Sequence, residues 1–144
     1  MQEIPSRTYN DDVMFICKIR GVEAIEKEYG KLKNYDVVLT DERKNHILER
    51  RGKKDFDIIM KYLKTTLLDY DYILDDSRRN KKGIIYIKCI NDEYFCAIFV
   101  ALSLNNSEYA NSHITGIVMN SKSFVKYVAT RKVIDKKCHL KYNI

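Results

Sequence analysis

The sequence has few residues that break regular structure and no stretch that resembles an export signal or a membrane span. Its 144 residues include one proline, five glycines and no tryptophan, so there is no obvious linker between domains. No run approaches the roughly eighteen apolar residues of a membrane span, and no early apolar run has the flanks of a signal peptide. We therefore expect one cytoplasmic domain, residues 1–144, with loosely ordered segments at 1–12 and 136–144.

Several motifs that mark well-known chemistries are also absent. The chain has no phosphate-binding P-loop, no Gly-x-Gly-x-x-Gly, no His-Glu-x-x-His and no Gly-x-Ser-x-Gly, which argues against nucleotide, NAD, zinc and serine-hydrolase chemistry. The four cysteines, Cys17, Cys89, Cys96 and Cys138, contain no Cys-x-x-Cys pair and lie beside apolar residues. We expect reduced, mostly buried thiols, and neither a metal site nor a cofactor.

Positive charge is present in moderate excess. There are 26 Lys and Arg against 20 Asp and Glu, which gives a formal net charge of +6. A basic balance favours polyanionic partners such as nucleic acid or an anionic membrane without deciding between them. Eleven tyrosines are available to combine base stacking with that charge, although tyrosine is equally common in strands and cores.

The first half of the chain alternates short apolar runs with helical patterns. Residues 13–19 and 35–39 are short enough to be strands, and a short helix is expected between them. Thr40 is a good N-cap for a helix over residues 41–51, which Gly52 would end. A second helix should follow, with an apolar stripe that belongs to the core.

The second half is rich in β-branched and aromatic residues. The runs at 84–90, 94–104 and 113–119 are separated by turn compositions and predict an antiparallel meander. Ser121 can cap a last helix, and the segment from residue 131 to 141 is a basic tail. The predicted class is α+β, with helices packed on a roughly four-stranded antiparallel sheet.

The helix at 41–51 carries the first candidate site. Glu42, His46 and Arg50 are spaced by four residues and so share one face, and Arg43 lies three residues before His46. An imidazole can act as base or acid, and a guanidinium can hold a phosphate, so these groups suit phosphodiester cleavage. The alternative is a solvated helix face, which the spacing alone favours.

A second candidate site lies in the segment "NSHIT". His113 and Thr115 should point to one face of a strand, although the pattern alone slightly favours a half-exposed strand with polar residues facing solvent. Among the basic stretches, Lys53 and Lys54 are candidates for binding the backbone of a nucleic acid, while most such charges serve solubility.

Three segments, in this order, resemble a known family: "VVLTDERKNHILERR" (37–51), "LLDYDYILDD" (67–76) followed by "GIIYIKCI", and "YANSHITGIVM" (109–119). They are similar to the phage barnase/EndoU/colicin/RelE-like nucleases (PBECR), over about residues 35–120. That family has a strand-to-helix junction leading into His-Ile-x-x-Arg-His, then paired strands, then an Asn-Ser-x-Ile-Thr strand.

The resemblance implies a barnase-like α+β fold and a ribonuclease that needs no metal. By position, His46, Arg50 and Thr115 match the motif's histidine, arginine and threonine, and Asn111 and Ser112 match its Asn-Ser pair. The departures are Arg51 in place of the second histidine, Tyr70 in place of a proline, and His113 at an aliphatic position. Because arginine does not titrate near neutral pH, Arg51 would hold the phosphate, and His113 would replace the lost imidazole.

The leading hypothesis is a phage or toxin-type endoribonuclease that cleaves RNA, such as tRNA or mRNA, through attack by the 2′-hydroxyl. His46, Arg50, Arg51, Thr115 and His113 would be catalytic, and Arg43, Asn111, Ser112, Lys53 and Lys54 would bind substrate. The alternative, motivated by Arg51, is a nuclease fold that has lost catalysis and binds RNA or a protein partner. An active intracellular ribonuclease would also need a cognate inhibitor protein.

Overall fold

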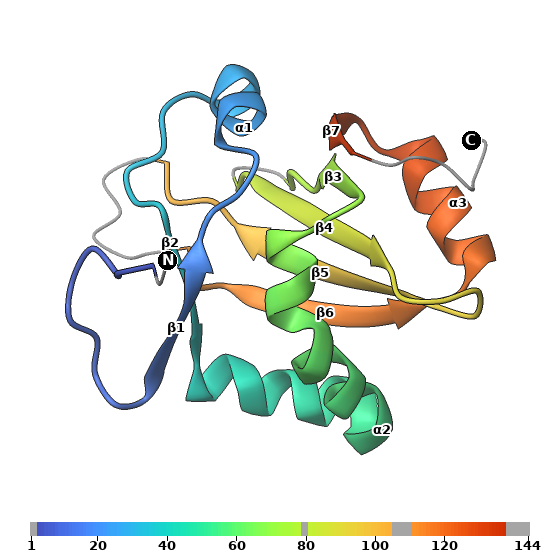
Figure 1. The fold of residues 1–144 in the computed structure, drawn as a ribbon, viewed down its shortest axis with the longest axis horizontal. Coiled ribbons are helices and arrows are strands. Elements are labelled where there is room, and N and C mark those ends of the chain that lie inside the picture. Colours follow the sequence, from blue (N-terminus) through green and yellow to red (C-terminus); the bar gives the residue numbers. More distant parts are fainter. Residues whose placement is uncertain (1–2, 79–80, 105–110, 138–144) are drawn as a thin grey trace.

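The computed structural model describes residues 3–78, 81–104 and 111–137 (Figure 1). In chain order the elements are β1 (Val13–Lys18), α1 (Val22–Tyr29), β2 (Asp36–Thr40), α2 (Asp41–Leu68), β3 (Tyr72–Asp75), β4 (Gly83–Cys89), β5 (Phe95–Ala101), β6 (Ile114–Met119), α3 (Ser121–Thr130) and β7 (Val133–Lys136). This arrangement confirms the predicted α+β class. No helix in the described ranges is both long and apolar enough to cross a membrane.

The strands form two sheets. Five of them make an antiparallel sheet in the order β6-β5-β4-β3-β7, and β1 pairs with β2 in a separate ribbon. The meander of β4, β5 and β6 is confirmed, but the sheet has one strand more than the expected four. The additional strand, β7, lies in the segment that we expected to be only a basic tail. Its sequence "VIDK" has two apolar residues, so its pairing with β3 leaves little trace in the pattern.

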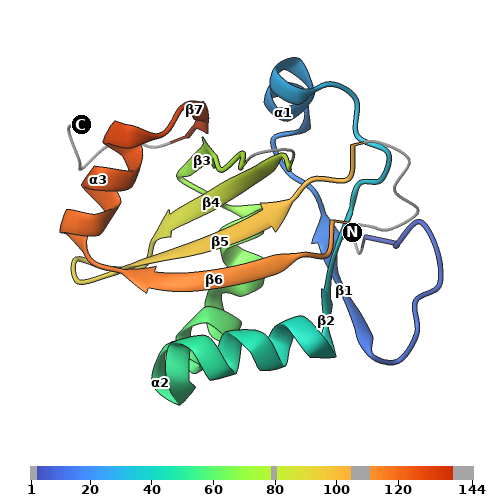
Figure 2. The same ribbon diagram turned by 180° about the vertical axis from the view of Figure 1, so that it is seen from behind.

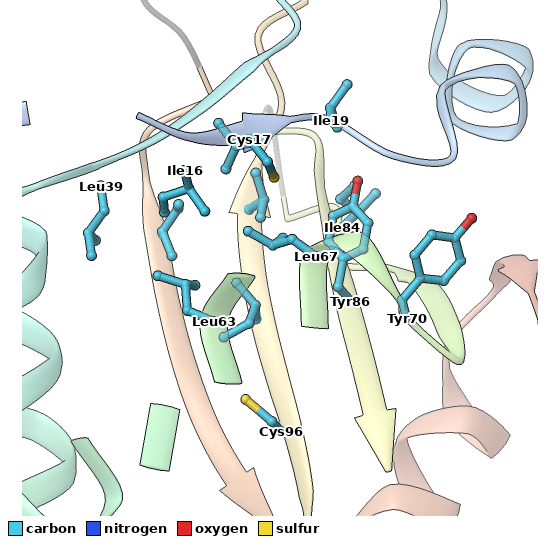
Figure 3. Packing of buried hydrophobic residues seen from close by; sticks show 14 of the residues in the cluster. Ile16, Cys17, Ile19, Leu39, Leu63, Leu67, Tyr70, Ile84, Tyr86 and Cys96 are labelled. Atoms are coloured by element: carbon cyan, nitrogen blue, oxygen red, sulfur yellow. The ribbon is translucent and has the colours of Figure 1, made fainter. Parts of the chain in front are cut away.

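One face of the large sheet packs against α2 and β1. Side chains from β1 and α2, such as Cys17 and Leu67, meet Ile84 and Tyr86 of β4 and Cys96 of β5 in a single apolar cluster (Figure 3). The second half of α2 stands in front of the sheet in Figure 1 and behind it in Figure 2, which places it on this face. Cys17 and Cys96 are buried, free thiols and Cys89 is half-buried, while Cys138 lies outside the described residues.

The opposite face of the sheet packs against α3. Ile85 and Ile87 of β4 alternate with the residues of the first cluster and join Phe95, Phe124 and Val128 in a second apolar cluster. Because successive side chains of a strand point to opposite faces, a strand buried on both faces is apolar without interruption. This explains why β4 and β5 appear in the sequence as continuous apolar runs.

Helix α2 consists of two parts. The Thr40 side chain accepts a hydrogen bond from the backbone N–H of Arg43, which confirms the predicted N-cap. Gly52 then leaves the helical conformation with φ of 82°, in the left-handed region that favours glycine, so the predicted end of the first helix is also confirmed. Helix α3 begins one residue from the expected place, because Asn120 rather than Ser121 caps it.

Candidate active site

A cavity of about 650 Å³ opens beside the outer strand β6. Its lining comprises Arg43, His46, Arg50, Arg51, Asp76, Arg78, Lys81, Lys82, Gly83, Phe99, Val100, Ala101, His113, Thr115, Ile117 and Tyr127. All five residues predicted to be catalytic are among them. Two segments predicted from separate patterns, the first helix and the "NSHIT" strand, therefore meet at one place.

The register of the sheet explains how the second segment reaches the cavity. Ile85 pairs with Phe99, and Phe99 pairs with Thr115, so the beginning of β4, the end of β5 and the beginning of β6 lie at the same end of the sheet. The alternation predicted for "NSHIT" is also present: Thr115 and His113 line the cavity, whereas Ile114 faces the core shared with α2.

The first half of α2 forms the wall of the cavity beside β6, and two arginines fasten it there. The Nε of Arg43 donates a hydrogen bond to the carbonyl oxygen of Ile114 (3.1 Å), and the Nε of Arg51 donates to that of Gly116 (2.9 Å). Because β6 is the outer strand of the sheet, no other strand of the described residues pairs with one side of its backbone. The two arginines therefore satisfy carbonyl groups that would otherwise be left to water.

Gly116 permits this close approach. A Cβ atom at this position would lie 2.7 Å from Cγ2 of Ile59, which belongs to the second half of α2. A methyl group on a β-branched side chain cannot easily move away, so any larger residue would push the helix away from the strand. The glycine in the middle of a strand thus sets the distance over which Arg51 reaches its carbonyl.

The cavity is strongly cationic. The lining that the structure describes contains six Arg and Lys side chains and one carboxylate, that of Asp76. Burial is the main cause that lowers the pKa of Arg43 and of Arg51. At Arg43 the charge of Glu42 opposes this shift more strongly than Arg50 adds to it, whereas at Arg51 the charge of Arg50 is the second cause of the lowered pKa. Arginine nevertheless remains protonated in proteins. Desolvated like charges repel each other, so this arrangement favours an anionic ligand.

The two histidines of the cavity are close enough to influence each other. Although His113 is exposed by surface area, partial desolvation at the cavity lowers its pKa, and the charges of Arg43, Lys81 and His46 lower it further. The neutral imidazole of His113 is therefore favoured over the charged form. A neutral imidazole is the form that accepts a proton.

The turn between β3 and β4 supplies a group of site residues that sequence reasoning did not assign. Asp76, Arg78, Lys81 and Lys82 line the cavity from this turn, and Arg78 and Lys81 bond to each other through their backbones. Burial raises the pKa of Asp76 despite the nearby cations. The only signal in the sequence was the dense charge of "DDSRRNKKG", and the sheet register was needed to bring that turn next to β6.

Aromatic residues close the end of the cavity near α3. Tyr127 lies edge-on to Phe99, with ring centroids 6.3 Å apart, and the guanidinium of Arg131 stacks over the Tyr127 ring at 4.1 Å. Both rings belong to the cavity lining. Nothing in the sequence pattern separated Tyr127 from the other tyrosines, because its position depends on how α3 packs on the sheet.

Four residues predicted to bind substrate do not line this cavity. Asn111 is fully buried, where its Nδ2 donates to the carbonyl oxygens of Asn34 and Asp36 and its Oδ1 accepts from the backbone N–H of Ser103. These bonds give it a structural position at the joint between β2 and β6. Its neighbour Ser112 is half-buried outside the cavity lining.

The other two, Lys53 and Lys54, are exposed on α2 just beyond the break at Gly52. Lys53 forms a surface ion pair with Asp57 (2.9 Å), the residue one helical turn further along. The change of backbone direction at Gly52 thus separates these lysines from the arginines that precede it. Across the described ranges, no group of three or more His, Cys, Asp or Glu side chains could hold a metal ion.

Comparison with protein families gives one match. The model of the phage-Barnase-EndoU-ColicinE5/D-RelE like nuclease3 family matches residues 15–113. The match begins at β1, earlier than the resemblance at residues 35–120 suggested, and it ends at His113, so Thr115 and α3 lie beyond it. Neither the curated proteins nor the solved structures give a match.

Proposed function

The chain belongs to this family of barnase-, EndoU-, colicin- and RelE-like nucleases, and from that premise we propose that it is a metal-independent endoribonuclease whose active site is the cavity beside β6. Family membership indicates a nuclease in general. The observation that carries the finer proposal is the meeting of two imidazoles with a group of desolvated arginines in one cavity.

Cleavage of RNA without a metal needs a base, an acid and positive charge on the phosphate. The neutral imidazole of His113 takes the proton of the 2′-hydroxyl, whose oxygen then attacks the adjacent phosphorus. The bond from phosphorus to the 5′-oxygen breaks, and that oxygen receives a proton from His46. The products are a 2′,3′-cyclic phosphate and a 5′-hydroxyl. His113 ends the step protonated and His46 ends it neutral.

Arg50 and Arg51 stabilise the phosphate as its negative charge increases. The hydrogen bond from the Nε of Arg51 to Gly116 fixes the plane of the guanidinium and leaves its terminal nitrogens available for two phosphate oxygens. In the proposed mechanism the hydroxyl of Thr115, a cavity-lining residue just before Gly116, donates a hydrogen bond to a phosphate oxygen. In this arrangement Arg51 binds the phosphate and His113 supplies the second imidazole.

The test is incubation of the purified protein with total bacterial RNA in excess EDTA, beside the His46→Ala, Arg51→Ala and His113→Ala variants. We expect discrete fragments with cyclic phosphate ends, and their loss in all three variants. Cleavage that requires added metal, or that survives in His46→Ala at the full rate, would contradict the mechanism.

A second candidate function is favoured by Arg51, which stands where the family motif has its second histidine. A nuclease fold that has lost catalysis would use the same cations to bind RNA or an acidic protein partner, such as a cognate inhibitor. It predicts tight binding that weakens as salt rises, with no cleavage of any RNA tested. The first assay separates the two functions when binding is measured on the same samples.

A further inference from the structure

The hydrogen bonds of Arg43 and Arg51 have a common geometry. Their acceptors, the carbonyl groups of Ile114 and Gly116, are two residues apart on the outer side of β6. Carbonyls two residues apart point to the same side of a strand and are separated by about 6.6–6.8 Å. The strand therefore holds the two guanidinium groups at a fixed interval along the wall of the cavity.

The helix alone would not set this interval. Arg43 and Arg51 are eight residues apart on α2, which corresponds to about 12 Å along a helix axis. Bonding to β6 brings the two side chains closer together than their backbones. Each guanidinium uses its Nε–H for the carbonyl and keeps the four N–H groups of its two terminal nitrogens.

Two residues with roles in the proposed reaction lie between the two hydrogen-bonded positions, one on the helix and one on the strand. His46 lies between Arg43 and Arg51 on α2, and Thr115 lies between Ile114 and Gly116 on β6. Arg43 is close to His113, whose pKa it lowers, whereas Arg51 lies at the end of the cavity near Tyr127. Along the helix and along the strand, the residues that bear the imidazole and the hydroxyl therefore lie between the two positions joined by these hydrogen bonds.

Neither arginine forms an ion pair within the described part of the chain, although both are half-buried. A desolvated guanidinium without a carboxylate partner is costly unless an anion completes it. Two such guanidinium groups at a fixed interval suit a linear polyanion whose negative groups recur at regular spacing. A nucleic-acid backbone is of this kind, because its phosphates recur at every sugar.

We propose that Arg43 and Arg51 bind two successive phosphates of one RNA strand. Arg51, with Arg50, holds the phosphate that is cut, and Arg43 holds the neighbouring phosphate on the side of His113. This inference rests on the proposed function and adds a substrate requirement to it. The substrate is a strand with at least one phosphate next to the scissile one, and a single phosphodiester is a poor substitute.

The test compares a dinucleoside monophosphate, which has one phosphate, with a trinucleotide that has two. For the parent protein kcat/KM should be at least about tenfold higher on the trinucleotide, as expected for one added charge-assisted contact. Arg43→Ala should lower kcat/KM much more on the trinucleotide than on the dinucleoside monophosphate, and so abolish this preference. Arg51→Ala should lower both rates, and Lys44→Ala, which removes an exposed charge beside Arg43, should change neither.

The conservative variant Arg43→Lys guards against a folding defect, and melting temperatures are measured for all variants. Lysine keeps the charge but has no Nε–H to bond the strand and no planar fork, so it should restore only part of the preference. Equal losses on both substrates in Arg43→Ala, with the melting temperature unchanged, would overturn the inference. So would a parent protein that cuts both substrates equally well.

Binding distinguishes failure of this inference from failure of the proposed function. Trinucleotides with 2′-deoxy sugars cannot be cut through the 2′-hydroxyl, so their affinity can be measured against salt. Arg43→Ala should make the slope of log K against log salt shallower, because one phosphate contact is lost. If the slope falls in Arg43→Ala but the parent protein cleaves no RNA, the ribonuclease function is refuted and the two-phosphate site is retained. If the parent protein cleaves RNA but the slope is unchanged in Arg43→Ala, the two-phosphate site is refuted and the ribonuclease function is retained.

Discussion

Two polar clusters, one around Asp36 and one in the cavity beside β6, differ in how their charges are satisfied. The carboxylate of Asp36 is fully buried and accepts hydrogen bonds from Lys18, Ser6 and Tyr9. Among the described residues that line the cavity, there are six cationic side chains and one carboxylate. Polar groups that satisfy one another hold a fold together, whereas like charges held near one another are useful only for a ligand of opposite charge.

The pKa values reflect the same contrast. Burial alone would raise the pKa of Asp36, but the hydrogen bonds from Lys18, Tyr9 and Ser6 outweigh it and hold the pKa below its usual value. For Arg43 and Arg51, burial and the neighbouring Arg50 both act against the charged form. The charge of Asp36 is satisfied within the protein, whereas we propose that a bound anion balances the cations of the cavity.

The largest expected effect is on catalysis. His46→Ala removes a proton-transfer group and should lower kcat/KM for RNA by about 10²–10⁴-fold, with little change in melting temperature. Asn45→Ala, at the exposed neighbouring position, serves as the matched control and should keep the parent rate. If the His46→Ala protein instead unfolds at a much lower temperature, the loss of activity would reflect a structural role of His46 and not a catalytic one.

The next effect is on stability. Asp36→Asn leaves Lys18 without its partner and should lower the free energy of unfolding by about 3 kcal/mol, measured by urea denaturation. Because the pKa of Asp36 is lowered in the folded state, its contribution is present above the ordinary pKa and disappears as the pH falls through the folded value. The stability of the variant should therefore fall less on acidification than that of the parent.

The exposed pair Lys53–Asp57 provides the control for this prediction. Asp57→Asn should change the free energy of unfolding by no more than about 0.5 kcal/mol, because surface ion pairs contribute little. If Asp36→Asn and Asp57→Asn lower the free energy of unfolding equally, the buried hydrogen bonds of Asp36 do not stabilise the fold more than a surface ion pair does.

A smaller change is expected where the helix meets the strand. Gly116→Ala should cost about 1–3 kcal/mol and should also slow cleavage, because the added Cβ moves α2 and with it Arg51. Gly30→Ala is the contrasting variant: its φ is 97°, and no atom lies within 4 Å of an added Cβ. It should cost stability through backbone strain alone and leave the rate per folded molecule unchanged.

The smallest expected change in stability comes from the cavity itself. Arg50→Ala should alter the free energy of unfolding by no more than about 0.5 kcal/mol, because its exposed charge repels its neighbours and supports no packing. RNA affinity should nevertheless fall, and its salt dependence should weaken. Lys54→Ala, an exposed cation outside the cavity, should leave affinity close to that of the parent, and an equal loss there would indicate diffuse charge attraction.

Much of the fold followed from local patterns. The cap at Thr40, the break at Gly52 and the three strands of the meander depend on neighbouring residues, and the structure confirms them. The strand β7 was missed because its charged, short sequence forms a strand only through pairing with β3. Local propensity is a weak guide where a long-range partner decides the conformation.

The same division applies to the site. The predicted helix face and the predicted strand face do meet in the cavity, whereas Asp76 and Tyr127 depend on sheet register and helix packing, which periodicity does not contain. Asn111 shows the opposite case, since a polar residue inside a family motif is placed at a buried joint of the backbone. A motif identifies residues that matter without saying whether they act on a substrate or on the fold.

In the proposed function, the cavity beside β6 cuts RNA through attack by the 2′-hydroxyl and without a metal. The most direct measurement is the rate of cleavage, in excess EDTA, of an RNA oligonucleotide beside the same oligonucleotide with a single 2′-deoxy sugar at the mapped cut. We predict that the RNA is cut to a 2′,3′-cyclic phosphate and that the substituted strand remains intact at that position. Equal cleavage of both strands, or no cleavage until a divalent metal is added, would contradict the account.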